Sequence, residues 1–118
     1  MLPWRWTRAG WRAVFAAGAV ALLLLSLLPL EIEEKGGFAH GDKVAHAMAF
    51  ACLAYAAVRG WPGRTRAIVL ALLGYGVAIE LLQTLTPLRS ASLPDVAADM
   101  VGVALGLVLA RGLARVRA

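Results

Sequence analysis

Long apolar segments alternate with short polar ones along the chain, and this alternation predicts helices over about residues 13–29, 43–59, 67–86 and 94–111. Each segment approaches the roughly 20 residues that a helix needs to cross a bilayer, although the second and fourth are short for a span. Pro29 and Pro87 end two of these segments and Pro94 begins another, consistent with a residue that breaks helices but is tolerated in their first turn. We therefore expect an all-α membrane protein with four transmembrane helices.

The composition favours a membrane protein over a soluble one. Of the 118 residues, 61% are hydrophobic and only 16% are charged, whereas an ordinary soluble domain has roughly 25% charged residues. A soluble domain of this size could not bury so much apolar surface, because much of the side-chain area of a small domain remains in water. We expect one membrane domain over residues 1–118, without a separate soluble domain.

A cleaved signal peptide is the alternative interpretation of the first apolar segment. Such a peptide needs a small-x-small cleavage site directly after its apolar stretch. The sequence Ser26-Leu27-Leu28-Pro29-Leu30-Glu31 contains none. We expect a retained anchor helix.

The basic residues, which give the chain a net charge of +5, lie at the ends of the apolar segments rather than in one patch. Nine of the twelve occupy the two tails and the second connection: Arg5, Arg8, Arg12, Arg59, Arg64, Arg66, Arg111, Arg115 and Arg117. Cytoplasmic segments carry an excess of Lys and Arg, so both termini are predicted to be cytoplasmic. All four tryptophans, at positions 4, 6, 11 and 61, fall on that same side. The charge pattern is thus a topology signal, and we expect no nucleic-acid partner.

Polar side chains interrupt the last three apolar segments: Asp42 and His46, Glu80 and Gln83, and Asp95 and Asp99. An ionisable side chain in mid-membrane costs roughly 2.5–3.5 kcal/mol on insertion scales, so such residues usually face the protein interior and mark function. At about 1.5 Å per residue, His46, Glu80 and Asp99 lie roughly 6–10 Å from the ends of their segments, on the outer side. We expect these residues to converge in one polar pocket that opens outward.

Several of these residues also have a purely structural interpretation. Asp42 and Asp95 could cap helix starts, where carboxylates accept hydrogen bonds from free N–H groups. Gly102 and Gly106 lie on the same face as the two fourth-helix aspartates and would allow close helix packing in lipid. A single histidine is more often a satisfied polar residue than a catalyst. Glu80 has no capping role in mid-helix and is the strongest functional candidate.

Taken in order, these motifs resemble the VanZ-like family over about residues 20 to 110. They are Ser26-Leu27-Leu28-Pro29, Asp42-Lys43-x-x-His46, Glu80-x-x-Gln83, Pro87-x-Arg89, and Asp95 followed by Gly102-x-x-x-Gly106. The family pattern has asparagine where this chain has Asp99. The founding member is associated with low-level teicoplanin resistance, and a helical core shared with lipid-processing enzymes has been proposed for such proteins. The resemblance implies a multi-pass protein of the bacterial inner membrane with a lipid or lipid-linked substrate.

Our leading hypothesis is a hydrolase or transferase that acts on the headgroup of a phospholipid or lipid-linked cell-envelope precursor. The catalytic candidates are Glu80, His46 and Asp95, with Glu80 or His46 as general base. The substrate-binding candidates are Arg89, Gln83, Asp42 and Asp99, with the planar guanidinium of Arg89 holding a phosphate. Asp95 and Asp99 would orient the base or hold a cation. A hard divalent ion such as Mg²⁺ would suit these oxygen ligands, but the sequence identifies no cofactor.

Two other function classes remain open at this point. In the first, the protein is a non-catalytic membrane accessory protein, and the same polar residues satisfy one another across helices. In the second, it is a small proton-coupled exporter. Small multidrug-resistance exporters carry their key glutamate in the first helix, where this chain has no ionisable residue, so we rank this class last. The sequence does not indicate the substrate or the oligomeric state.

Overall fold

The computed structural model describes residues 7–27, 39–83, 85 and 93–117, with the side chains of residues 39–43, 93–95 and 113–117 left out. Four helices make up nearly all of this part of the chain: α1 (Arg8–Leu27), α2 (Ala39–Gly60), α3 (Thr65–Gln83) and α4 (Leu93–Arg117). The described residues contain no strand. The predicted all-helical class is confirmed.

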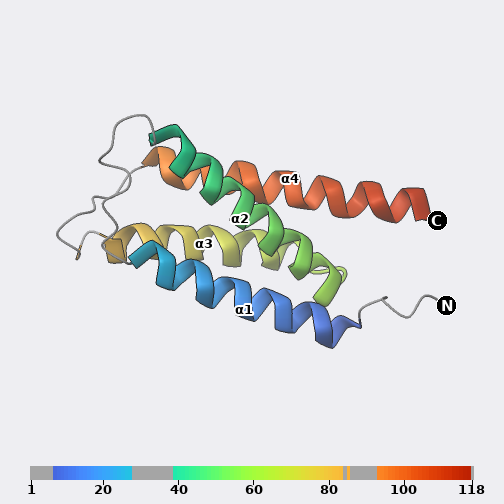
Figure 1. Ribbon diagram of the computed structural model, residues 1–118. Helices are drawn as coiled ribbons and strands as arrows, with labels where there is room; N and C mark the ends of the chain where they lie inside the picture. Colours follow the sequence, from blue (N-terminus) through green and yellow to red (C-terminus); the bar gives the residue numbers. More distant parts are fainter. Residues whose placement is uncertain (1–6, 28–38, 84, 86–92, 118) are drawn as a thin grey trace.

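The alanine-rich helix α2 lies at the centre of the bundle and contacts the other three helices. Its most extensive contact is with α4, followed by that with α1, and α3 completes the group. Successive helices run in opposite directions, so α1 begins and α4 ends at the same end of the bundle (Figure 1). Small side chains suit a helix with neighbours on several sides, because they let helix backbones approach closely.

All four helices begin earlier than the apolar pattern predicts, α1 by five residues, α2 by four, α3 by two and α4 by one. Helix α1 starts at Arg8 instead of residue 13, because the hydroxyl Oγ1 of Thr7 accepts a hydrogen bond from the backbone N–H of Gly10 at 3.0 Å and caps the first turn. Helix α2 starts at Ala39, so residues 39–42, which precede the helix predicted over 43–59, are helical as well. Gly41 lies in the first turn of α2. A glycine destabilises a helix less there than in the interior, where the N–H and the C=O of each residue both form hydrogen bonds within the helix.

The other boundaries also differ from the prediction. Helix α3 ends at Gln83 instead of residue 86. A tight backbone bond of 3.0 Å from the N–H of Leu85 to the carbonyl of Leu82 follows there, which is a common way to finish a last turn. Helix α4 continues through Arg117 instead of stopping near residue 111, because arginine is a good helix former and its charge favours a helix C-terminus.

The connection between α2 and α3 is a tight turn. The backbone N–H of Trp61 bonds to the carbonyl of Ala57 at 2.7 Å, which completes the last turn of α2. Gly63 then adopts a φ of 81°, a left-handed conformation that side chains with a Cβ rarely take. Helix α3 begins two residues later, antiparallel to α2.

The core is apolar and follows one side of α2, with Phe50, Leu53, Ala54 and Ala57 buried there against Leu72 and Ile79 of α3 and Val103 of α4. Large apolar side chains also lie on the outside. Leu24 of α1, Leu70 of α3 and Val108 of α4 are each at least 60% exposed. Among the described residues, α1 and α3 are long and apolar enough to cross a membrane by length and composition, and Val44–Gly60 of α2 is a shorter apolar segment. These features are compatible with a membrane protein, whose outer surface faces lipid.

Candidate functional site

A buried histidine–aspartate pair joins α2 to α4. Nδ1 of His46 lies 3.1 Å from Oδ1 of Asp99, within hydrogen-bonding distance. His46 is 6% exposed and Asp99 is fully buried. An aspartate in this position fixes both the orientation of the imidazole ring and the ring nitrogen that carries the proton.

Two glycines of α4 make this pairing possible by letting the helix backbones approach. A Cβ on Gly102 would overlap the carbonyl oxygen of Ala47. A Cβ on Gly106, one turn further along, would overlap the carbonyl of Ala51 and lie 2.9 Å from the Cβ of Ala54. The Gly102 and Gly106 pair therefore packs directly on the backbone of α2, on the helix face that was expected to meet a neighbour.

Helix α3 also packs against Asp99, and it does so at Gly76. A Cβ on Gly76 would lie 3.0 Å from Oδ2 of Asp99 and 3.6 Å from two ring atoms of Phe50. Within the described part of the chain, Oδ2 has no hydrogen-bond partner. One carboxylate oxygen of Asp99 thus binds His46, and the other faces Gly76 of α3, a residue without a side chain.

Glu80 and Gln83 continue from Gly76 along the same buried face of α3. Glu80 is 4% exposed, and the Nε2 amide of Gln83 donates a 2.8 Å hydrogen bond to the carbonyl oxygen of Ser26 near the end of α1. The predicted substrate ligand Gln83 therefore also ties α3 to α1. Because α3 ends at Gln83, Glu80 lies about 5 Å from that end instead of the roughly 10 Å expected.

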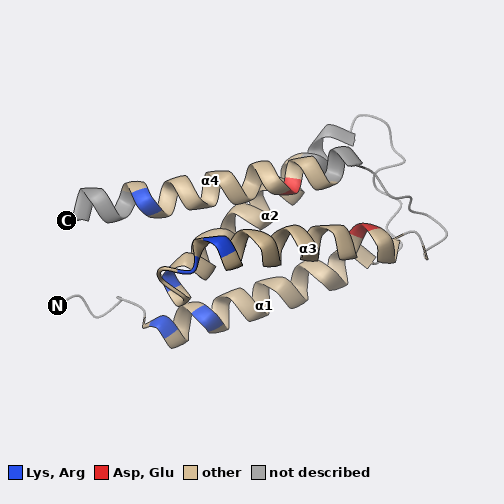
Figure 2. Ribbon diagram, turned by 180° about the vertical axis from the view of Figure 1, so that it is seen from behind, with Lys and Arg blue, Asp and Glu red and all other residues tan. Residues whose placement is uncertain are grey.

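The ionisable residues that are buried in the described part of the chain, His46, Glu80 and Asp99, lie toward the same end of the bundle. His46 and Asp99 come roughly 9–11 Å after the first residues of α2 and α4, at 1.5 Å per residue. Figure 2 shows the acidic positions of α3 and α4 toward the end away from the start of α1 and the end of α4. In the described part of these two helices, the acidic residues are Glu80 and Asp99. The buried polar residues of the three helices therefore share the end of the bundle opposite the start of α1. Their convergence in one pocket that opens outward stays a prediction.

Other predicted site residues fall outside the description. The side chains of Asp42 and Asp95 are not described, although both residues belong to helices, and Arg89 lies outside the described residues. Among the described residues, no group of three or more His, Cys, Asp and Glu side chains comes together to hold a metal ion. The described pair of His46 and Asp99 thus offers proton chemistry but does not by itself form a metal centre.

The sequence model of the VanZ/LLP1 family matches residues 4–115 of the chain. The chain belongs to the VanZ/LLP1 family. The match includes all of α2 and α3, and with them His46, Glu80 and Gln83, as well as Asp99 and both packing glycines of α4. A search of curated proteins found no significant match. A search of solved structures found none either.

At the opposite end of this VanZ-like bundle, arginines and aromatic rings form contacts that the sequence analysis did not foresee. Arg12 of α1 donates a 2.8 Å hydrogen bond from Nε to the carbonyl of Gly60, and its guanidinium carbon lies 5.2 Å from the centre of the Trp61 ring. The guanidinium carbon of Arg59 lies 5.6 Å from the ring centre of Trp11 and 5.6 Å from that of Tyr55.

From the sequence, these arginines and tryptophans are predicted only to mark the membrane topology. The sequence signal for these contacts was that arginines and tryptophans lie close together at the α2–α3 connection, because arginine binds the face of an aromatic ring. The pairing itself depends on how α1 lies against the end of α2, which local sequence does not specify.

Proposed function

We propose that this VanZ/LLP1 protein acts on the headgroup of a phospholipid or lipid-linked cell-envelope precursor, as a hydrolase or transferase. The observation that carries this proposal is the buried contact of 3.1 Å between His46 and Asp99. A carboxylate that faces Nδ1 favours the tautomer with its proton on that nitrogen. Nε2 is then the basic nitrogen, and it is the atom that would accept a proton from the attacking hydroxyl or water.

The other polar residues complete this proposed site. Glu80, buried near the same end of the bundle, is a second general acid or base. Arg89, which follows Pro87, would hold the phosphate of the headgroup, and its loss is expected to weaken lipid binding roughly ten- to hundredfold. Gln83, Asp42 and Asp95 would contact the headgroup or orient the base.

The proposed location is the bacterial inner membrane, with four spans and both termini in the cytoplasm. The distribution of charge along the bundle supports this orientation. The described basic residues lie toward the end where α1 begins and α4 ends, away from Glu80 and Asp99 (Figure 2). With basic segments in the cytoplasm, the proposed headgroup site would open toward the outer leaflet, where it could affect glycopeptide resistance.

The test is headgroup release or exchange by the purified full chain in proteoliposomes, together with lipid profiles of membranes with and without the protein. The wild type should convert a headgroup, and His46→Gln should not. Cys52→Ala is the matched control, because Cys52 is exposed on the same helix, and this variant should behave as the wild type. Unchanged lipid profiles and equal headgroup turnover in vesicles with and without protein would refute the proposal.

The accessory hypothesis is the second candidate, and the full burial of Asp99 favours it. A fully buried carboxylate paired with histidine can serve helix packing alone, because polar side chains hydrogen-bond across helices in membranes. Under this hypothesis, an isosteric change that keeps the packing leaves the cellular phenotype intact. Under the catalytic hypothesis, the same change abolishes it.

A further inference from the structure

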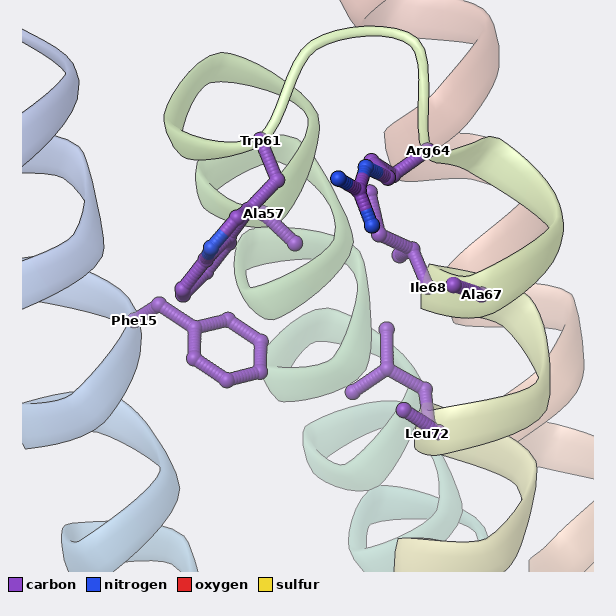
Figure 3. A pocket seen from close by; sticks show the side chains of 8 residues that line it. Phe15, Ala57, Trp61, Arg64, Ala67, Ile68 and Leu72 are labelled. Atoms are coloured by element: carbon purple, nitrogen blue, oxygen red, sulfur yellow. The ribbon is translucent and has the colours of Figure 1, made fainter.

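A hollow of about 250 Å³ lies toward the basic end of the bundle, and neither His46 nor Asp99 lines it. It is bounded by α1, by the end of α2 and by the first turns of α3 (Figure 3). Phe15 and Trp61 form one side, and their rings meet edge to face with centres 5.4 Å apart. Ile68 and Leu72 of α3 form the buried floor.

The lining of the hollow is apolar except for one cation. Arg64 lies in the α2–α3 connection, and its guanidinium extends over the hollow toward Trp61 (Figure 3). Within the described part of the chain its side chain makes no hydrogen bond or ion pair. This distinguishes Arg64 from Arg12 and Arg59, which contact a backbone carbonyl or aromatic rings. Arg64 thus presents a planar fork of donors at the mouth of an apolar space, and no described residue accepts a hydrogen bond from it.

The hollow is open on the side of α3. Ala71, which lines it, is exposed, whereas Ile68 and Leu72 beneath are buried. From Thr65 the lining extends roughly 10 Å inward along α3. In a bundle that spans a membrane, this opening faces lipid tails at the level just below the headgroups. Empty apolar cavities of about 150 Å³ already accept a molecule of the size of benzene, so this one has room for a stretch of hydrocarbon chain.

We propose that this hollow binds a single anionic phospholipid of the leaflet on the basic side, with an acyl chain between α1 and α3 and its phosphate on Arg64. Two features favour this occupant over a neutral amphiphile. Guanidinium groups bind phosphate through paired, charge-assisted hydrogen bonds. Trp61, which forms one wall, belongs to the residue type that prefers the headgroup level of a bilayer. The site differs in position and ligand role from the proposed headgroup site, because its lipid is held and not converted.

The site can be measured by native mass spectrometry of the full chain in detergent, titrated with phosphatidylglycerol or phosphatidylcholine. We expect one phosphatidylglycerol to bind at least about tenfold more tightly than phosphatidylcholine. Arg64→Gln should remove this preference, and Arg64→Lys should restore part of it. Arg66→Gln is the matched control, because Arg66 is exposed beside the turn but does not line the hollow, and it should keep the preference.

A second variant tests the acyl-chain part of the site. Ala71→Phe should fill the opening and weaken phosphatidylglycerol binding while Arg64 remains in place. Two results would overturn the acyl-chain part of the site: release of the lipid by inorganic phosphate alone, or tight binding by Ala71→Phe. Either result would mean that the lipid contacts the protein only through its headgroup. Equal loss in Arg66→Gln and Arg64→Gln would overturn the proposal in favour of a diffuse cationic surface. None of these results depends on headgroup turnover, so they can be separated from a failure of the proposed enzymatic function.

Discussion

His46 on α2 and Asp99 on α4 face each other across the most extensive helix contact in the described structure, with 3.1 Å between Nδ1 and Oδ1. Gly102 lies on the same helix as Asp99 and packs against the backbone of Ala47, the residue that follows His46. The close packing and the polar contact therefore support each other. A larger residue at position 102 would separate the two helices and stretch the His46–Asp99 bond.

The first prediction concerns the charge of Asp99. Asp99→Asn keeps an oxygen that can accept a hydrogen bond from Nδ1 of His46, but it cannot stabilise the imidazolium that forms when His46 takes up a proton. We expect a folded protein whose headgroup turnover falls substantially. His46→Gln, which removes the base, should lose roughly 10²- to 10⁴-fold. Turnover in proteoliposomes, with lipid binding measured separately, checks both values.

The family pattern that this sequence resembles has asparagine at the position of Asp99. If Asp99→Asn retains full turnover while His46→Gln abolishes it, the carboxylate only positions the ring, and its charge has no part in the reaction. If both variants are fully active, His46 is not the base.

The second prediction concerns the contact between α2 and α4. Gly102→Ala places a Cβ on the carbonyl of Ala47 and should lower the free energy of unfolding by about 1–3 kcal/mol, the usual cost of overpacking. Gly74→Ala is the control, because a Cβ at that exposed position meets nothing within 4 Å. It should leave stability unchanged or raise it slightly, since alanine favours helix. Denaturation in detergent measures both, and equal stabilities would show that the helices can move apart at no cost.

Much of the helical arrangement could be predicted from the sequence, because apolar length and the positions of proline and glycine are local signals. The face of α4 that meets a neighbour was also predictable from the spacing of Asp99, Gly102 and Gly106. The identity of the neighbouring helix was not predictable from the sequence. The structure gives α2 as that neighbour, and this depends on the summed packing of all four helices.

Helix ends were less predictable, for a physical reason. The start of α1 depends on the hydrogen bond from Gly10 to Thr7, which precedes the apolar segment and leaves no trace in its hydrophobic pattern. The hydrogen bond between Gln83 and the carbonyl of Ser26 is similarly invisible in sequence, since it joins distant segments through a backbone group. The motif Glu80-x-x-Gln83 indicated the right helix face but not that Gln83 binds α1.

The third prediction concerns Glu80. Glu80→Gln preserves the shape of a side chain that is 4% exposed, so the protein should fold and bind lipid. If Glu80 moves a proton in the reaction, headgroup turnover is lost, because an amide cannot do so. Val77→Ala, at a partly exposed position on the same helix, is the control and should retain activity. Full turnover by Glu80→Gln would defeat its catalytic assignment and favour the accessory hypothesis.

The fourth prediction concerns orientation. In a Cys52→Ala background, we expect a membrane-impermeant maleimide added to intact cells to label Gly37→Cys but neither Pro62→Cys nor Ala118→Cys. The reason is the clustering of Lys and Arg in both tails and in the connection that contains Pro62. Labelling after membrane permeabilisation serves as the control for reactivity. Labelling of Pro62→Cys or Ala118→Cys from outside would reverse the proposed orientation and place the headgroup site on the cytoplasmic side.

The last prediction concerns Arg12, whose Nε donates a hydrogen bond to the buried carbonyl of Gly60 while its guanidinium covers Trp61. Lysine keeps the positive charge, and with it the topology signal, but lacks the planar fork that serves both contacts at once. Because Arg12 is itself exposed, we expect Arg12→Lys to cost only about 1–2 kcal/mol of stability. Arg8→Lys, at an exposed position one turn earlier on α1, should cost little.

A double-mutant cycle with Trp61→Phe separates the ring contact of Arg12 from its hydrogen bond. The coupling between Arg12 and Trp61 should be about 0.5–1 kcal/mol, the usual strength of an exposed cation–π contact. Because Trp61 also forms a wall of the lipid hollow, the cycle is best run in detergent with and without phosphatidylglycerol. If Arg12 holds α1 against the end of α2 and so shapes that hollow, Arg12→Lys should also weaken phosphatidylglycerol binding. A loss of stability with unchanged lipid binding would mean that Arg12 fastens α1 without shaping the hollow.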